Sequence, residues 1–362
     1  MNPLIAPRRL SRPGTTVLFG TALLTLAPQG AAQGCLAIRP AGGPVIPGTL
    51  LVPQAHGFQV SAGYRYLYAD RYFMGTEELP MPPGSQVINE IHSFDLAFSY
   101  APTPRLSLTL GLPFQWGERT TRHEHSGTMT GPQYATEAGG IGDLRLTGDF
   151  WFLDPRKHPR GNVSLGIGVK APTGDDAVED DFHTPEGIVH RPVDVAIQPG
   201  DGGWGFLVQM QGFYHVVGEL NAYANGFYLF NPREVNGTAS FSPPGSPNQD
   251  DVNSVPDQYL GRAGLSYGLW PKAGLALSVG GRIDGLPVRD AFGGSEGFRR
   301  PGYVVSVEPG LSWNWNRYSL SVTAPVALLR DRQRSVTDEI TGGHGDASFA
   351  DFALFANLSA RF

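Results

Sequence analysis

The sequence predicts an all-β fold, a transmembrane antiparallel up-and-down β-barrel of about 12 strands with short turns at one end and long loops at the other. Three observations predict it. Apolar and polar residues alternate in many segments of similar length, the chain ends on such a segment, and the connections between segments alternate between short and long. Since side chains alternate across a strand, each segment has one apolar and one polar face.

The last segment, residues 348–362, carries the pattern to the end of the chain. Phe352, Leu354 and Phe362 fall on one face, and Asn357 and Arg361 fall on the other. An edge strand of a soluble sandwich is the alternative for this segment alone. In a bacterial barrel the final strand closes the sheet, and a terminal Phe362 resembles the signal that the outer-membrane assembly machinery reads.

The N-terminus is typical of an exported protein. Three arginines at positions 8, 9 and 12 precede a short apolar run, 15–26, and small residues follow at 30–32. The run is too short for a spanning helix, so residues 1–32 are predicted to be a signal peptide that is removed. Cys35 leaves a lipoprotein as the alternative, but the usual leucine three positions before it is missing.

Residues 33–56 are rich in Pro and Gly and are expected to form a periplasmic lead-in, with the barrel at residues 57–362. No other segment reaches the ~18–20 apolar residues that a spanning helix needs. Yet 41% of residues are hydrophobic, 48 are Gly and only 17% are charged. This composition favours a membrane barrel.

The formal net charge of −6 includes the leader arginines, so the mature chain is more acidic still. An acidic chain gives no sign of a nucleic-acid partner. A single cysteine allows neither an intrachain disulfide nor a cysteine-based zinc site. No cofactor and no metal is predicted.

In order along the chain, the alternating segments predict strands at 57–69, 89–100, 105–116, 142–153, 161–171, 204–217, 220–230, 257–269, 272–284, 301–315, 317–329 and 348–362. The third strand is the clearest, because leucines at 106, 108, 110 and 112 oppose polar residues at 105, 107 and 109. The seventh is ambiguous, because Tyr223 and Phe227 oppose small residues.

The connections between these strands alternate strictly. Short ones fall near 101–104, 154–160, 218–219, 270–271 and 316, and long ones near 70–88, 117–141, 172–203, 231–256, 285–300 and 330–347. Short periplasmic turns and long external loops are typical of outer-membrane barrels. In the hydrocarbon core every backbone N–H and C=O must be paired, which a closed sheet achieves.

If the apolar face meets lipid, the polar face lines the lumen. The candidate lumen-lining residues are Arg65, Asp95, Arg105, Asp143, Arg145, Asp149, Lys170, Arg262, Arg282, Asp284, Glu308, Asp351 and Arg361. Their charges nearly cancel. Either opposed acidic and basic rows orient a passing polar solute, or the charges pair into networks that stiffen a mostly filled barrel.

Two further activities have weaker support. A surface hydrolase needs a nucleophile beside a base, but His92 and Ser93 are adjacent in a strand and point to opposite faces. No G-x-S-x-G motif occurs. The acidic runs at 175–181 and 250–251 could supply oxygen ligands to calcium, although solvated loops are often acidic too.

Three motifs at strand ends suggest a family. They are GGIGD at 139–143, KAPTGD at 170–175 and QPGDGGW at 198–204. With the terminal strand, they resemble the outer-membrane transporter family associated with the meta-pathway of phenol degradation. The resemblance implies a barrel for uptake of small, often hydrophobic or aromatic compounds. The matching positions are Gly140, Gly142, Asp143, Pro172, Thr173, Gly174, Asp175, Pro199 and Gly200.

These positions also have a structural explanation. Glycine allows close backbone approach where a strand bends into a loop. Pro172 ends strand pairing because it has no N–H. Asp143 and Asp175 can accept hydrogen bonds from nearby backbone N–H groups.

The sequence therefore predicts a bacterial outer-membrane channel for passive or facilitated uptake of a small molecule, for which the resemblance implies a hydrophobic or aromatic compound. Its expected partners are membrane lipid, the barrel-assembly machinery and the solute, and the loop aromatics Tyr134, Phe182 and Phe292 are candidate selectivity residues. A plugged barrel with a structural or surface-recognition role is the alternative. A lipid-active enzyme is a further possibility.

Overall fold

A computed structural model describes residues 55–82, 84–127, 131–240 and 252–362. The predicted signal peptide, Cys35, almost all of the lead-in and the acidic pair at 250–251 lie outside these ranges. The elements are β1 (Gly57–Met74), β2 (Glu77–Leu79), β3 (Ile88–Ala101), β4 (Leu106–Thr121), α1 (His123–Ser126), β5 (Tyr134–Ile141), β6 (Leu144–Trp151), β7 (Gly161–Ala171), β8 (Glu179–Thr184), β9 (Gly187–Pro192), β10 (Gly205–Val217), β11 (Leu220–Phe230), β12 (Val235–Ala239), β13 (Val252–Ser254), β14 (Gln258–Trp270), η1 (Pro271–Ala273), β15 (Leu275–Leu286), β16 (Gly302–Trp315), β17 (Tyr318–Thr323), β18 (Val326–Arg332), α2 (Val336–Thr341) and β19 (Ala347–Arg361).

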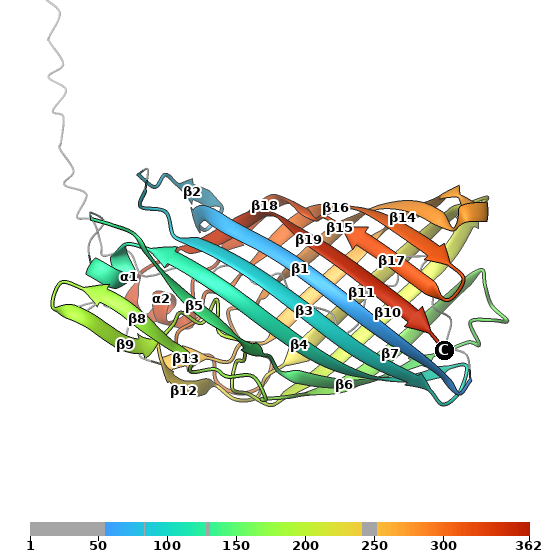
Figure 1. Cartoon of the computed structure of the whole chain (residues 1–362), viewed down its shortest axis with the longest axis horizontal. Helices are drawn as coiled ribbons and strands as arrows, with labels where there is room; N and C mark the ends of the chain where they lie inside the picture. The colour runs from blue at the N-terminus through green and yellow to red at the C-terminus, as the bar shows by residue number, and fades with distance from the viewer. Residues whose placement is uncertain (1–54, 83, 128–130, 241–251) are drawn as a thin grey trace, which may run out of the picture.

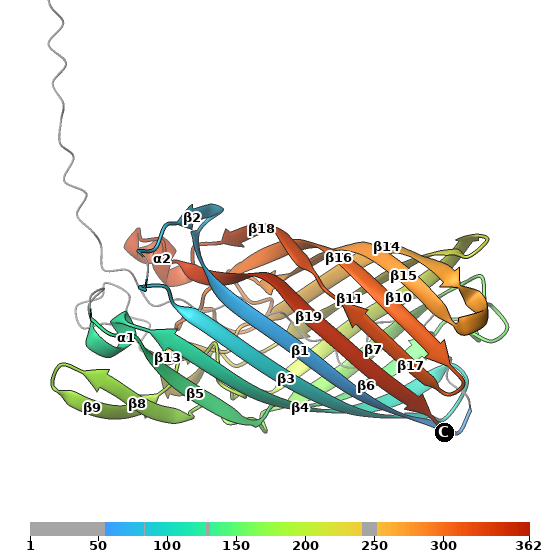
Figure 2. The ribbon, with the colours of Figure 1, turned by 45° about the horizontal axis from the view of Figure 1, so that its top comes forward.

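Fifteen of these strand segments form one antiparallel sheet that closes on itself, because β19 pairs with β1 from Gln59↔Arg361 to Phe73↔Ala347. β2 is a short hairpin strand, and β5 with β6 and β17 with β18 are each two halves of one crossing. Twelve crossings remain, so the predicted twelve-stranded barrel is confirmed. The strands are strongly tilted and each lies beside its sequence neighbour (Figures 1 and 2).

The two ends of the barrel differ as the connection lengths predicted. The short turns, the start of β1 and the C-terminus lie at one end, where Phe362 N–H donates to Phe58 O (2.8 Å). At the other end lie α1, α2 and the hairpins β8–β9 and β12–β13, all formed within the long connections (Figure 1). Among the described residues, no helix is long and apolar enough to cross a membrane.

Two crossings are interrupted in ways that alternation did not predict. The fourth was expected to begin at residue 142, but it begins at Tyr134 and breaks at residues 142–143, between β5 and β6. The eleventh breaks between β17 and β18, where Pro325 has no N–H to donate. Several strands also extend beyond their predicted ends toward the long loops, β1 to Met74 and β4 to Thr121.

The outer face of the wall is mostly apolar. On β7 the outward side chains Val163, Leu165, Ile167 and Val169 are 42–58% exposed, whereas their inward neighbours are small or buried. This is the reverse of a soluble protein, in which large aliphatic side chains are mostly buried. It is the surface that a membrane barrel presents to lipid.

We expect Ile167→Arg to lower the stability of the barrel in lipid vesicles by about 2–4 kcal/mol, because a charge near the middle of a strand would face hydrocarbon. Urea titration followed by heat-modifiable gel mobility measures this. Ile188 is the matched control, since it is 63% exposed on β9 outside the barrel wall. Equal effects of Ile167→Arg and Ile188→Arg would contradict a lipid-facing wall.

Candidate functional site

The inner face of the barrel holds most of the charged residues that the sequence singled out. Eight of them are buried, namely Arg65, Asp143, Asp149, Lys170, Arg262, Arg282, Asp284 and Glu308. Asp95, Arg145 and Arg361 are half-buried on inward-facing strand positions. Alternation along each strand puts these side chains on the face opposite the exposed aliphatic residues.

Two of the predicted charges are not buried on the inner face. The Arg105 guanidinium precedes β4 and lies over the outward-facing ring of Phe150, 4.5 Å from its centroid, so Arg105 does not line the lumen. Its N–H groups donate to the carbonyls of Trp151 and Phe152 at the short-turn end. Asp351 is 54% exposed and pairs with Arg71 at 2.5 Å. Two turn carbonyls hold the Arg105 side chain outside the lumen, which strand parity alone cannot predict. Asp351 also pairs with Arg330, which is buried.

Several inward charges pair with one another. Arg262 Nη1 lies 3.0 Å from Glu308 Oε1, and Arg282 Nε lies 2.8 Å from Asp284 Oδ1. The Arg282 guanidinium also lies 4.8 Å from the centroid of the inward-facing Phe355 ring. These two ion pairs have the geometry expected if the lumen charges pair with one another and stiffen the barrel.

The three glycine-rich motifs meet at one junction in the wall. The Cα atoms of Gly142 and Gly200 lie 2.9 Å and 2.7 Å from where a Cβ on Gly174 would be, so the three backbones touch. Lys170 Nζ contacts the Asp201 carboxylate and lies 3.6 Å from Asp143 Oδ2. Residues far apart in sequence thus form one compact joint.

Hydrogen bonds hold the joint together. Asp143 Oδ1 accepts from the Gly174 N–H (3.0 Å), and Thr173 Oγ1 donates to Gly142 O (2.9 Å) and accepts from the Leu144 N–H (2.9 Å). Asp175 Oδ1 accepts from the Ala177 N–H (2.9 Å). Asp143 and Asp175 therefore cap backbone donors, the structural role expected of them.

The wall is incomplete beyond this joint. β7 pairs with β6 as far as Ala171↔Leu144, whereas β5 pairs with β4 alone in the barrel sheet. The second edge of β5 is approached by the β8 hairpin, where the Glu137 N–H donates to Asp180 Oδ2 (2.8 Å). A loop therefore covers the wall between β5 and β7 on the long-loop side.

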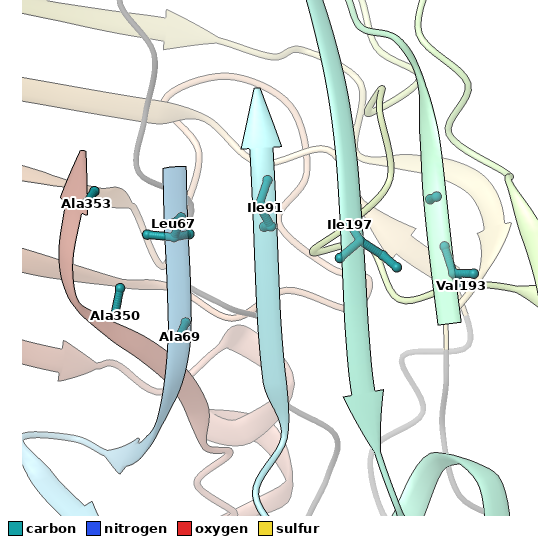
Figure 3. Close-up of a cluster of buried hydrophobic side chains, with 8 residues drawn as sticks. Leu67, Ala69, Ile91, Val193, Ile197, Ala350 and Ala353 are labelled. Carbon is teal, nitrogen blue, oxygen red and sulfur yellow. The ribbon is translucent and has the colours of Figure 1, made fainter. Parts of the chain in front are cut away.

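Residues 193–201, here called the inward loop, fold into the barrel. Val193 and Ile197 pack with Leu67, Ile91 and inward-facing alanines of β1, β5 and β19 in an apolar cluster (Figure 3). Ile197 is fully buried. A Cβ on Gly117 would lie 2.9 Å from Ile197 Cβ, so glycine is what lets the loop approach β4 this closely.

Polar contacts also fasten the inward loop to the wall. Gln115 Nε2 donates to the carbonyls of Ile197 (3.3 Å) and Gln198 (3.2 Å). Gln198 Nε2 donates to the carbonyls of Val178 (3.0 Å) and Val193 (3.1 Å). These bonds satisfy loop carbonyls that would otherwise be buried without partners.

A buried ion cluster holds the loop from the other side. Asp194 Oδ2 lies 3.0 Å from Arg300 and 3.8 Å from Arg119, and Arg119 pairs with Glu124 of α1 at 2.5 Å. Burial alone would raise the pKa of Asp194, but Arg119 and Arg300 outweigh it and hold that pKa below its usual range. Asp194 is therefore ionised and clamped between two arginines.

Asp346, just before β19, is buried near Arg300 and Arg332, and its Oδ1 has no hydrogen-bond partner among the described residues. Burial raises the pKa of Asp346 to about 6, with the arginines only partly opposing it. An unfolded aspartate loses its proton near pH ~3.9. The stabilisation from the protonated group is thus complete below pH ~4 and is lost as the pH rises through about 6.

Asp346→Asn stays neutral, so we expect its stability relative to wild type to rise between pH 4 and pH 8 by about 2–3 kcal/mol. Urea midpoints of both proteins at each pH measure this. Asp338→Asn should behave oppositely, because Arg332 and backbone N–H groups outweigh burial and lower the pKa of Asp338. Its stability relative to wild type should fall as the pH rises from acid through the unfolded pKa of ~3.9, and should stay level up to pH 8. A fall for Asp346→Asn between pH 4 and pH 8 would contradict the assignment.

The inward loop and its clamp were missed by sequence reasoning. Val193, Asp194, Ile197, Arg119 and Arg300 all lie in or beside predicted long loops. The one local signal was the alternation of Val193, Val195 and Ile197 within a predicted loop. Among the loop aromatics, Phe292 is 63% exposed, but Phe182 is buried against His125 of α1, which removes it as a free lining residue.

The structure also bears on the enzyme and calcium alternatives. Ser93 is fully buried and accepts from Arg65 Nη2 (2.8 Å), whereas His92 faces outward with Tyr64 Oη 2.8 Å from its Nδ1. The two side chains therefore lie on opposite faces, as the strand pattern predicted. In the described ranges no three His, Cys, Asp or Glu side chains are grouped to hold a metal ion.

No protein-family model and no curated protein matches the sequence. Among solved structures, the chain is similar to an outer membrane channel from Pseudomonas putida F1, with 14% identity, 88% of this chain and 100% of that chain covered, and a TM-score of 0.58. The β domain of the Bordetella autotransporter BrkA (10% identity, 85% and 100% covered, TM-score 0.43) and the P. putida toluene transporter TodX (10%, 88% and 93%, 0.42) also align. The first similarity shows that this chain has the fold of an outer-membrane β-barrel, and the phenol-pathway family stays a prediction.

Proposed function

We propose that this protein is an outer-membrane channel that passes a small, hydrophobic or aromatic molecule by passive or facilitated diffusion. One observation carries the proposal: the inward loop lies inside the barrel, packed in the apolar cluster around Ile197 and fastened by Gln115 and by the Asp194 ion pair. Release of Asp194 and of the Gln115 contacts would open the lumen without unpairing a strand.

The lining suits an apolar solute. Beside the cluster around Ile197, a second buried apolar cluster lies on the inward faces of β10, β11 and β14, formed by Leu207, Phe227, Leu229 and Leu260. Both clusters are buried while the inward loop lies in the barrel. Release of the loop would expose the cluster around Ile197, and such apolar surface lowers the cost of moving a hydrophobic molecule through. The partners follow from this role: lipid at the outer face, the assembly machinery at Phe362, and the solute inside.

A cysteine lock tests the proposal. With Cys35 replaced by serine, Gly117→Cys and Ile197→Cys would lie slightly closer than the ~3.5–4.5 Å between Cβ atoms of a disulfide, so a small loop shift lets the bond form. We expect oxidation to suppress single-channel conductance and the flux of small aromatic solutes into proteoliposomes, and reduction to restore both. Each single-cysteine variant is the control.

A plugged structural barrel is the second candidate. The near-complete burial of Leu67, Ile91 and Ile197 favours it, because the loop packs as tightly as a core. A barrel that is folded by heat-modifiable mobility yet silent in both the oxidised and reduced states would support this candidate over a channel.

A further inference from the structure

A second group of polar side chains lies on the inner wall of β6, β7 and β10, away from the inward loop. Thr147, Asp149 and Trp151 point inward from β6, because the intervening Leu146 and Phe150 are 52% and 43% exposed on the outer face. Ser164 and Gly166 point inward from β7 by the same alternation. Register pairs Asp149 with Gly166 and Trp151 with Ser164.

Asp149 differs from the other buried acids of the lumen. Glu308, Asp284 and Asp143 each lie within 4 Å of an arginine or lysine nitrogen. Asp149 is 7% exposed, and within the described part of the chain it accepts one hydrogen bond, from Gln209 Nε2 (2.7 Å). No ion pair to it forms among the described residues, although a buried carboxylate normally has a cationic partner.

Two unpartnered hydroxyls flank this carboxylate. Thr147 and Ser164 are 1% and 0% exposed, and neither Thr147 Oγ1 nor Ser164 Oγ has a hydrogen-bond partner among the described residues. Buried hydroxyls usually do have partners. Together with Asp149, they offer several acceptor oxygens to a donor inside the barrel.

Gly166 leaves room for the side chains of Asp149 and Gln209 beside the wall. A Cβ on Gly166 would lie 2.3 Å from Asp149 Oδ1 and 2.6 Å from Gln209 Cγ, so any side chain there would displace both. Toward the short turns, Trp151 and Phe213 pack edge to face with centroids 6.0 Å apart. An aromatic pair thus lies next along the wall from an unpaired carboxylate.

We propose that Thr147, Asp149, Ser164, Trp151 and Phe213, here called the Asp149 patch, bind an organic cation, an ammonium group attached to an apolar or aromatic body. The ammonium donates to the Asp149 carboxylate and the two hydroxyls, a charge-assisted interaction stronger than a neutral one. The apolar body lies against Trp151 and Phe213, whose faces also attract cations. This names a solute class for the proposed channel and rests on that function for the route by which the solute arrives.

Three aromatic probes of similar size test it: benzylammonium, benzyl alcohol and benzoate. Equilibrium dialysis against the folded, detergent-solubilised protein measures binding without requiring transport. We expect benzylammonium to bind at least tenfold more tightly than benzyl alcohol, and benzoate not to bind. Asp149→Asn, which keeps the shape, should remove that preference, whereas Glu118→Gln removes an acid from the outer face of β4 and should leave it intact.

Ser164→Ala covers the case in which Asp149→Asn does not fold, since it removes a single hydroxyl and should weaken benzylammonium binding about threefold to tenfold. Absence of binding by all three probes, or equal binding of benzylammonium to wild type and Asp149→Asn, overturns the proposal. A conductance measurement tests the proposed channel separately from the proposed cation site. A conducting barrel without cation preference refutes only the Asp149 patch, and a silent barrel that binds benzylammonium through Asp149 refutes only the channel.

Discussion

Asp194→Asn is expected to release the inward loop and raise both the open probability of the channel and the flux of small solutes. The substitution removes the charge that pairs with Arg300 at 3.0 Å and Arg119 at 3.8 Å, while Arg300 stays buried. Removing one partner of a buried ion pair typically costs about 3–5 kcal/mol. The substitution destabilises the loop in its position inside the barrel, so the equilibrium shifts toward the state in which the loop is released. Single-channel recording in a planar bilayer measures the shift.

The chain offers a matched control on the same side of the barrel. Arg289 and Glu339 form an ion pair at 2.6 Å, but both side chains are more than 40% exposed. An exposed pair contributes at most about 1 kcal/mol, so Glu339→Gln should leave conductance unchanged. If Asp194→Asn conducts like wild type while folded, the clamp does not close the lumen.

Gly200→Ala is expected to have the largest effect on the glycine joint. A Cβ there would lie 2.4 Å from Gly174 O, and these backbone atoms cannot move aside as a flexible side chain can. Overpacking costs about 1–3 kcal/mol even where side chains relax, so we expect at least this loss. The contact between Lys170 and Asp201 next to the joint should break with it.

Two measurements separate the joint from the barrel as a whole. Urea titration in lipid reports global stability, and protease sensitivity of the 172–204 segment reports release of the loop. Gly281→Ala is the control, because a Cβ there meets no atom within 4 Å. Wild-type protease resistance in Gly200→Ala would show that the three glycine backbones are not needed to seat the loop.

Much of the fold was predictable from the chain because a strand pattern is local. Residues 105–116 reveal their apolar and polar faces without reference to any other segment, and the structure has β4 there. Connection lengths are equally local, so the two ends of the barrel could be told apart. The charges on inward positions, such as Arg262 and Glu308, followed from the same alternation.

The break in the fourth strand was not predictable in the same way. Residues 117–141 were expected to form a long loop and the strand to begin at residue 142, so neither β5 nor the break after it was predicted. At the break, Gly142 packs against Gly174 and Pro199, residues that come from other parts of the chain. Arg105 and Phe182 also lie away from their expected positions because of contacts with distant residues. Arg105 contacts the Phe150 ring, and Phe182 packs against His125 of α1.

The sequence by itself therefore determined the barrel. It determined the strands, their closure into one sheet and which face of each strand is apolar, because apolar and polar residues alternate between neighbouring positions. Only the tertiary structure decided that residues 193–201 fold inward and that Asp194 meets Arg119 and Arg300. These contacts join residues about 75 and 106 positions apart, and their energy comes from burying charges together. Pairing over such distances leaves no periodic pattern in the sequence, so the wall could be predicted and the inward path of residues 193–201 could not.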